Sequence, residues 1–361
     1  MSKDQFDDYG DLVYHYTDQF GLVGIIERRE LWATNISYLN DASEVAYGLE
    51  FFRNHNGECI QVLKNSLQID DRFSSSFEKV FEYLISQADA RHFLKDPKEY
   101  LYVSSFFESA SLRKVTISGI DAGDNLEQWR AYSKGGVGYS IGFDKKLLTS
   151  QVAKQTGADL YTYCGSCIYS KEEKTARVRE TLEILEPACD IAMHTAYGDW
   201  AEKQHAVICM DGSVTPPGAS TELRRGEDKP KDREAISSAL QWYWGRKMIS
   251  TSFMKHEAFA MEHEWRIVRL AFTNSEQIQF KTRKDGIVPY SAVSIADDKS
   301  PEHLVPGIIR RIVAGPLGDA SFSKRQRDVR SVKMLLEHNG VEVKSEGHEN
   351  GVIIESSELP C

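Results

Sequence analysis

Near the start of the chain stands the sequence Val13-Tyr14-His15-Tyr16-Thr17. Its β-branched and aromatic residues predict a strand that ends near Thr17. Asp18 is the predicted N-cap of a short helix, because apolar residues recur at helical spacing from Phe20 to Ile26. An extended segment, Leu31-Trp32-Ala33-Thr34, follows. This strand, helix and strand bring a histidine and a threonine to one edge of a sheet, an arrangement typical of the wall of a ligand-binding site.

Composition limits the class of protein. The chain has 361 residues, of which 41% are hydrophobic, so it can bury a large core, and we expect a single enlarged domain over 1–361. The formal net charge of -10 argues against broad electrostatic binding of nucleic acid or anionic membrane. The acidic N-terminus lacks an apolar signal region, and no apolar run is long enough to span a membrane. We therefore expect a cytoplasmic protein.

The rest of the chain alternates strand patterns with two long helical segments. We expect helical insertions at 44–98 and 171–255, the second containing a mobile loop at 210–232 that is rich in proline, glycine and charge. Strand patterns occur at 100–107, 139–143, 161–169, 262–270, 278–281, 287–294, 308–314 and 352–355, and a helix is expected at 323–339. Because there is no steady βαβ rhythm, the pattern predicts an α+β fold with a mixed, mainly antiparallel sheet.

The segment Glu262-His263-Glu264-Trp265-Arg266 alternates as a strand does. Side chains two residues apart share a face, so we expect Glu262, Glu264 and Arg266 to point the same way. A surface ladder of ion pairs is the alternative interpretation. With His256 and Glu257 the segment also forms a dense His/carboxylate cluster, which keeps a metal site open as an alternative. Alternation divides that cluster between two faces, so we assign no metal ligand.

Two resemblances to known families follow from these motifs. The first strand and helix, with His15-x-Thr17 and then Leu31-Trp32-Ala33-Thr34, resemble the NAD-binding strand and helix of ADP-ribosyltransferases with a His-Tyr-Glu site. Over most of its length the chain also resembles a bacterial family known as domain of unknown function 2971. That resemblance rests on the first motif and on Leu39-Asn40-Asp41, Ser105-Phe106, Trp129-Arg130-Ala131-Tyr132, Glu262-x-Glu264-x-Arg266, Val288-Pro289-Tyr290, Ala314-Gly315-Pro316 and Ser356-Ser357-Glu358-Leu359-Pro360.

The transferase resemblance implies NAD as a substrate and a set of roles. His15 would bind the ribose on the adenosine side, Glu264 would contact the nicotinamide ribose, and Glu262 would align an acceptor. His15, Glu262 and Glu264 are thus the expected catalytic residues. The expected NAD-binding residues are His15, Tyr16, Thr17, Thr34, Tyr38, Asn40, Ser105, Trp129, Tyr132 and Arg266, with Tyr38, Trp129 or Tyr132 stacking on nicotinamide.

The resemblance therefore implies an enzyme with the ADP-ribosyltransferase fold. Such an enzyme cleaves NAD at the nicotinamide–ribose bond and transfers ADP-ribose to a macromolecule, protein or nucleic acid, as a toxin or anti-phage effector would. Two alternatives stay open: a metal-dependent hydrolase or nuclease, and a non-catalytic module that senses a ligand or partner. The enzyme hypothesis makes one spatial prediction, which is that His15 and Glu264 line one cleft.

Overall fold

The computed structural model describes residues 11–39, 43–67, 69, 71–92, 101–108, 121–132, 138–155, 160–197, 207–208, 214–215, 230–271, 278–283, 286–316, 322–344, 351–357 and 359. The chain divides into two compact units. A sheet unit comprises Met1–Tyr38, Tyr102–Cys167 and Ala260–Cys361, and a helical unit comprises Leu39–Leu101 and Ile168–Phe259. The stretches 44–98 and 171–255, expected as helical insertions, fall within the helical unit.

The sheet unit begins with the predicted strand, helix and strand. β1 (Leu12–Asp18) leads into α1 (Gln19–Arg28), and β2 (Glu30–Asn35) follows. The Asp18 carboxylate accepts a hydrogen bond from the Gly21 amide at 2.8 Å, which confirms the predicted N-cap. Arg29 ends the helix in a left-handed conformation with φ 57°. The buried face of α1 packs into the main core, so sequence and packing agree over this unit.

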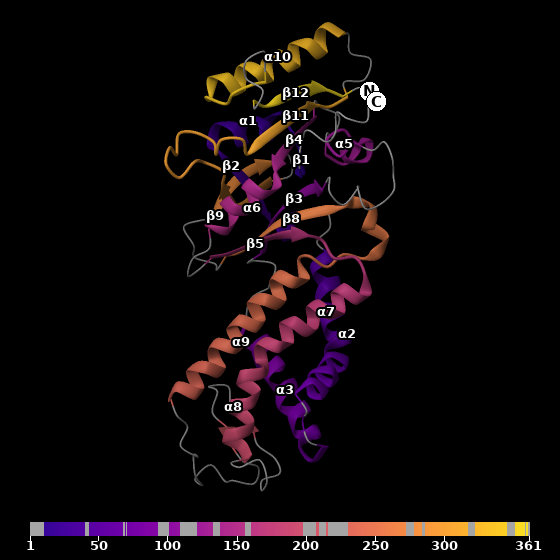
Figure 1. Cartoon of the computed structure of the whole chain (residues 1–361), viewed down its shortest axis with the longest axis vertical. Coiled ribbons are helices and arrows are strands. Elements are labelled where there is room, and N and C mark those ends of the chain that lie inside the picture. Colours follow the sequence, from indigo (N-terminus) through magenta and orange to yellow (C-terminus); the bar gives the residue numbers. More distant parts are fainter. Residues whose placement is uncertain are drawn as a thin grey trace. The chain divides into compact units, whose positions relative to one another are not determined.

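The described strands of this unit all belong to one large sheet. The further strands of the unit are β3 (Leu101–Glu108), β4 (Gly138–Asp144), β5 (Leu160–Ser166), β8 (Glu264–Ala271), β9 (Ile278–Arg283), β10 (Gly286–Ser294), β11 (Ile309–Ala314) and β12 (Ile353–Ser356). Its further helices are η3 (Ile36–Tyr38), α5 (Leu126–Tyr132), α6 (Lys145–Ala153) and α10 (Phe322–His338), and η6 (Glu257–Glu262) precedes β8 in the chain. The strands pair in the order β12-β11-β4-β1-β3-β2-β10-β9, and β8 pairs with β3 and β5 (Figure 1). The pairs β1–β3, β1–β4, β2–β3, β2–β10, β9–β10, β4–β11 and β5–β8 are antiparallel, and the β11–β12 pair is parallel. The predicted α+β class with a mixed, mainly antiparallel sheet is confirmed.

The two faces of the sheet carry different cores. The core face, as we call it, holds Val13, Phe106 and Trp265 in the main hydrophobic cluster with residues of α1, α6 and α10. The second face holds Tyr14 and Phe107, which pack with Trp129 of α5 and its neighbours. Tyr14 and Phe107 are paired across β1 and β3, so their side chains lie on the same face. Because side chains alternate along a strand, this pair fixes the face of each further residue of β1 and β3.

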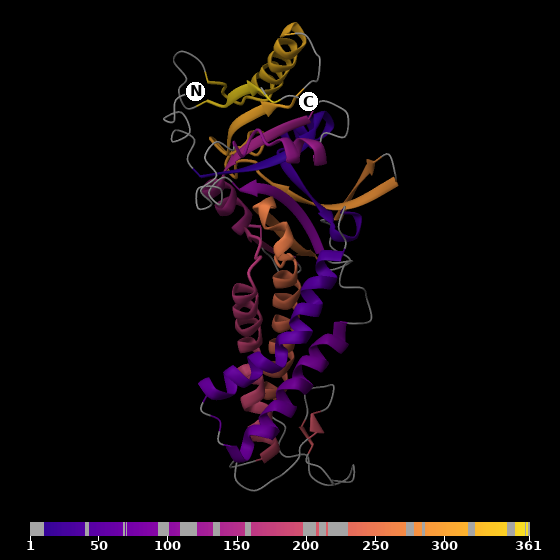
Figure 2. The same cartoon turned by 90° about the vertical axis from the view of Figure 1, so that its right-hand side faces the viewer.

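The helical unit is built from long helices. These are α2 (Ser43–Ser66), α3 (Asp71–His92), α7 (Lys171–Leu182), α8 (Glu186–Tyr197) and α9 (Pro230–Thr251), with η5 (Glu183–Leu185) and the short strands β6 (Val207–Ile208) and β7 (Val214–Thr215). α2, α7 and α9 run alongside one another (Figures 1 and 2). Their core includes Phe52, Phe81 and Tyr243. Most of the expected mobile loop, 210–232, lies outside the described residues.

Buried lysines of the helical unit each meet an oxygen partner. Lys247 binds both carboxylate oxygens of Asp89 at 2.8 Å, and Lys174 donates to the Tyr47 hydroxyl at 2.7 Å. Burying a cation is costly unless it is paired in this way. These contacts explain how a unit with strongly charged helices keeps lysines in its interior.

Within the described residues, no helix combines the length and apolar character that a membrane-spanning helix needs.

Candidate functional site

His15 lies on β1 close to the central strand β3. Its Nδ1 atom is 3.0 Å from the Ser105 carbonyl oxygen, and its ring contacts Phe106 with centroids 5.3 Å apart. A carbonyl can only accept a hydrogen bond, so Nδ1 carries the proton. Burial, with a smaller contribution from the charge of Lys281, lowers the pKa of His15. The imidazole is therefore neutral near pH 7 and offers Nε2 as a hydrogen-bond acceptor.

Glu264 and Arg266 form a buried ion pair at the start of β8. Arg266 Nε donates to Glu264 Oε1 and Nη2 donates to Oε2, each at 2.8 Å. Their side chains are 10% and 3% exposed, respectively. The two residues share a face, as their spacing predicts, but they are buried and do not form the surface ladder that was the alternative interpretation. The bidentate geometry holds the carboxylate in one orientation.

Glu262 departs from the predicted strand. It is the last residue of η6, and β8 begins two residues later at Glu264. Between them His263 has φ 40°, a left-handed conformation that interrupts strand alternation. The prediction that the strand includes Glu262 is therefore wrong, and strand geometry does not give the direction of its side chain. The sequence did not predict this break before the strand, because the alternation of polar and apolar residues does not show that one residue has a positive φ.

The position of His15 relative to Glu264 also differs from the expectation of one shared cleft. His15 alternates with Tyr14 and so belongs to the core face, beside Phe106. Trp265 contacts Phe106 on that same face, with ring centroids 5.3 Å apart, so alternation directs Glu264 to the second face. The residues approach β3 from different faces. Ser105, which accepts the hydrogen bond from His15, points its side chain to the second face.

A cluster that the sequence did not reveal lies on the second face around Thr34. The registers Thr34–Val103, Tyr290–Thr34 and Val288–Lys281 place Thr34, Tyr290 and Lys281 on one face. Lys281 Nζ donates to Thr34 Oγ1 at 3.1 Å. The same ammonium lies 5.0 Å from the Trp32 ring centroid and 5.6 Å from that of Tyr290. We call Trp32, Thr34, Lys281 and Tyr290 the Lys281 cluster.

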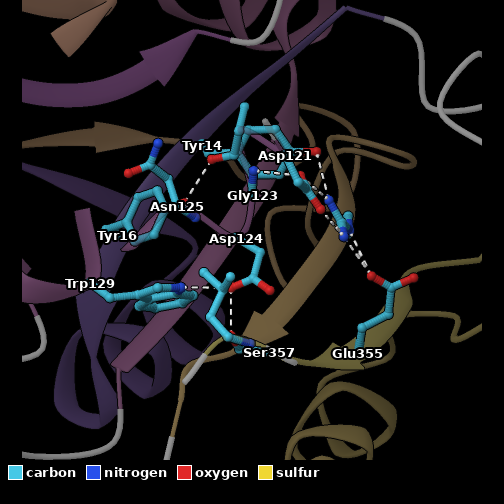
Figure 3. A network of polar contacts seen from close by, with 12 residues as sticks. Tyr14, Tyr16, Asp121, Gly123, Asp124, Asn125, Trp129, Glu355 and Ser357 are labelled. Atoms are coloured by element: carbon cyan, nitrogen blue, oxygen red, sulfur yellow. Dashed lines mark hydrogen bonds and ion pairs between the residues drawn. The ribbon is translucent and has the colours of Figure 1, made fainter. Parts of the chain in front are cut away.

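A polar network occupies the second face over β1, β4 and β11 (Figure 3). Tyr16 donates from its hydroxyl to the Ala122 carbonyl at 2.7 Å and accepts from the Asn125 amide at 3.0 Å. The Trp129 indole N–H donates to Asp124 at 2.7 Å, and its ring packs edge-on against Tyr16. Trp129 is 2% exposed. This tryptophan is a core residue, so the structure does not offer its ring as a stacking surface for nicotinamide.

The same network includes hydrogen bonds to residues near the end of the described chain. Arg311 donates to both oxygens of Asp121, at 2.8 and 2.7 Å, and to Glu355 Oε2 at 2.9 and 2.6 Å (Figure 3). Ser357 donates to the Asp124 carboxylate at 2.6 Å. Several motifs used for the family resemblance thus meet in one structural network, and their shared role there is to anchor the 121–132 segment and β12.

The remaining predicted site residues have separate surroundings. Thr17 packs under α1, where a Cβ on Gly21 would stand 1.9 Å from the Thr17 hydroxyl oxygen. Tyr38 ends η3 and is 48% exposed. Asn40 lies outside the described residues. Tyr132 is the last residue of α5, and its side chain also lies outside them. These residues add nothing to the geometry of the Lys281 cluster.

The metal-site alternative depended on the segment from His256 to Glu264. Within it, His256 Nδ1 accepts from the Ala258 amide at 3.2 Å, and burial lowers the pKa of His263. Among the residues that the structure describes, no group of three or more His, Cys, Asp or Glu side chains could hold a metal ion. The segment therefore supplies no geometric support for metal chemistry.

The fold defines an α+β protein built on a mixed, mostly antiparallel sheet. Residues 128–267 match the model of a family described as "Protein of unknown function (DUF2971)". The matched range runs from α5 into β8 and includes Trp129, Glu264 and Arg266, so it supports the family resemblance over that part of the chain. No curated protein and no solved structure matches the chain.

Proposed function

We propose that the protein is an ADP-ribosyltransferase-like enzyme that binds NAD at the sheet unit and transfers ADP-ribose to a macromolecular acceptor. The observation that carries the proposal is the convergence of distant residues on β3. His15 donates to the Ser105 carbonyl, and Thr34 is paired with Val103. Glu264 lies on the face to which Ser105 and Thr34 also point. Three motifs separated by most of the chain thus meet along a single strand.

The proposed chemistry breaks the bond between the ribose C1′ and the nicotinamide nitrogen. The bonding electrons leave with nicotinamide, and C1′ becomes oxocarbenium-like. The fixed Glu264 carboxylate would stabilise this developing positive charge, as carboxylates do in glycoside hydrolysis. An acceptor nucleophile then bonds to C1′ and loses its proton to water. His15 lies on the core face, opposite Glu264, so its part in this proposal is to hold β3 through the Ser105 carbonyl, and the ribose contact that the resemblance implied for it is not included.

The test measures nicotinamide release from NAD by the full-length protein, with labelled-NAD transfer in a cell lysate to supply an acceptor. We expect Glu264→Gln to abolish transfer while NAD binding, measured by calorimetry, persists. We expect His15→Ala to weaken NAD binding. Glu302→Gln and His303→Ala are matched controls, because both side chains are more than half exposed. A wild-type protein that neither binds NAD nor transfers the label would refute the proposal.

A second candidate function is favoured by the bidentate ion pair. Because both oxygens of Glu264 accept from Arg266, the carboxylate is already engaged within the fold. In a non-catalytic module that senses a nucleotide, this pair would be purely structural. Such a protein would bind NAD with ordinary affinity and release no nicotinamide in any lysate. The binding and release measurements above therefore separate the two functions.

A further inference from the structure

We propose that Lys281 binds the diphosphate of the nucleotide, which makes the β9–β10 hairpin the anion-binding part of the site. This inference rests on the proposed function and names the group of the substrate that the Lys281 cluster recognises. It concerns a residue that the sequence patterns did not single out. Lys281 lies far along the chain from Thr34, which it contacts.

The surroundings of Lys281 suit an ammonium that serves a ligand. The residue is half-buried on β9, and its Nζ donates to the Thr34 hydroxyl at 3.1 Å. Thr34 itself is 4% exposed. While its oxygen accepts from Lys281, its own O–H can donate to a second acceptor. An ammonium and a hydroxyl side by side are a suitable pair of donors for a phosphate oxygen.

Aromatic rings and a second cation flank this pair of donors. The Lys281 ammonium lies over the faces of Trp32 and Tyr290, which holds it by cation–π attraction. The Arg28 guanidinium lies 5.7 Å from the Trp32 ring centroid, and its Nη1 donates to the Tyr290 hydroxyl at 3.3 Å. The Glu30 carboxylate lies beside the same indole: it accepts from the Trp32 ring N–H at 2.9 Å and is 4.0 Å from Arg28 Nη1, so it offsets the charge of Arg28. The positive charge that would attract a compact anion is therefore that of Lys281.

His15 lies on the core face and does not contact the proposed ligand, but the charge of Lys281 acts on its pKa, so His15 can report an anion bound at Lys281. The positive charge of Lys281 contributes, after burial, to the lowered pKa of His15. A bound diphosphate would offset that charge and raise the pKa of His15. The chemical class that fits is a nucleoside diphosphate linked to a second sugar. Its phosphates would lie at Lys281 and Thr34 on the second face of the sheet, the face to which Glu264 also points.

The experiment compares ligands with and without a diphosphate. The full-length protein is titrated by calorimetry with inorganic pyrophosphate, ADP-ribose and nicotinamide riboside. We expect Lys281→Met to weaken binding of pyrophosphate and ADP-ribose at least about tenfold, which is the loss of one charge-assisted contact. Binding of nicotinamide riboside should not change. Lys281→Arg should retain most of the affinity, and Lys333→Met, an exposed lysine of α10, should retain all of it.

Two further measurements keep the inference testable whatever the variants do. In the wild type, ADP-ribose should protect Lys281 from acetylation while Lys333 stays reactive, as read by mass spectrometry. By NMR, pyrophosphate should raise the pKa of His15 in the wild type and leave it unchanged in Lys281→Met. Equal affinity of wild type and Lys281→Met for pyrophosphate and ADP-ribose, or absence of protection at saturating ADP-ribose, would overturn the inference.

The outcomes also distinguish failure of this inference from failure of the proposed function. If ADP-ribose binds through Lys281 and no nicotinamide is ever released from NAD, the enzymatic function is wrong and the anion site stands. If Lys281→Met cleaves NAD with the kcat and KM of the wild type, the anion site is wrong and the enzymatic function stands.

Discussion

The Glu264–Arg266 ion pair provides the sharpest quantitative prediction. Both side chains are nearly inaccessible, at 10% and 3% exposure, so solvent screens their interaction little. Removing one partner of a buried pair strands an uncompensated charge and costs about 3–5 kcal/mol, whereas replacing both by apolar residues is close to neutral. We therefore expect Glu264→Leu and Arg266→Met each to lower the free energy of unfolding by about 3 kcal/mol or more. The double variant should recover most of that loss.

The assay is urea and thermal unfolding of the two single variants and the double variant, both followed by circular dichroism. For a unit of this size, a loss of about 3 kcal/mol lowers Tm by about 6–12 °C. The exposed helix pair Lys333–Glu337 is the control, and breaking it should cost about 0.5 kcal/mol or less. Additive losses in the double variant would refute the reasoning. They would mean that Glu264 does not depend on Arg266, which would favour a carboxylate available to substrate.

Two further predictions concern Gly24 and His15. Alanine normally stabilises a helix interior by about 1 kcal/mol relative to glycine, but a Cβ on Gly24 would stand 2.5 Å from the Trp32 ring. We expect Gly24→Ala to lower the free energy of unfolding by about 1–3 kcal/mol in chemical denaturation, and Gly57→Ala, with nothing within 4 Å, to raise it; the reverse order would contradict this packing. For His15, the lowered folded-state pKa means that the unfolded chain binds the proton more tightly. Its contribution to stability is therefore complete above the ordinary pKa of 6.5 and is lost as pH falls through the folded value. NMR titration should show a His15 pKa below 6.5, and His15→Phe should flatten the stability profile there.

Much of the fold could be predicted from local sequence patterns. The strand ending near Thr17, the Asp18 cap, the helix after it and the tail strands follow from patterns within a few residues, and the structure contains them. α6 was missed, because Lys145–Ala153 is short and one of the residues on its buried side, Gln151, is polar. Glu262 was expected in the strand, but β8 begins at Glu264, and the positive φ of His263 before it cannot be seen in the alternation of residue types.

The site depended more on long-range contacts. Trp129 looked like a ligand-stacking residue in a motif, yet the structure surrounds it with Tyr16, Asp124 and Gly315. Lys281 looked like one lysine among many, and its contact with Thr34 follows from the registers of β2, β9 and β10. A sequence pattern cannot show such a contact, because strand order and register are properties of the assembled sheet.

The stretch Val13-Tyr14-His15-Tyr16-Thr17 by itself determined a strand, the alternation of its side chains and the helix that follows, since these depend on neighbours along the chain. Only the tertiary structure decided what each side chain meets. In the structure Tyr16 contacts Trp129 and Asn125, and His15 lies against the Ser105 carbonyl. Glu264 points to the second face of the sheet, opposite His15. The physical reason is that partners across a sheet are chosen by register and burial, which involve residues far apart in sequence.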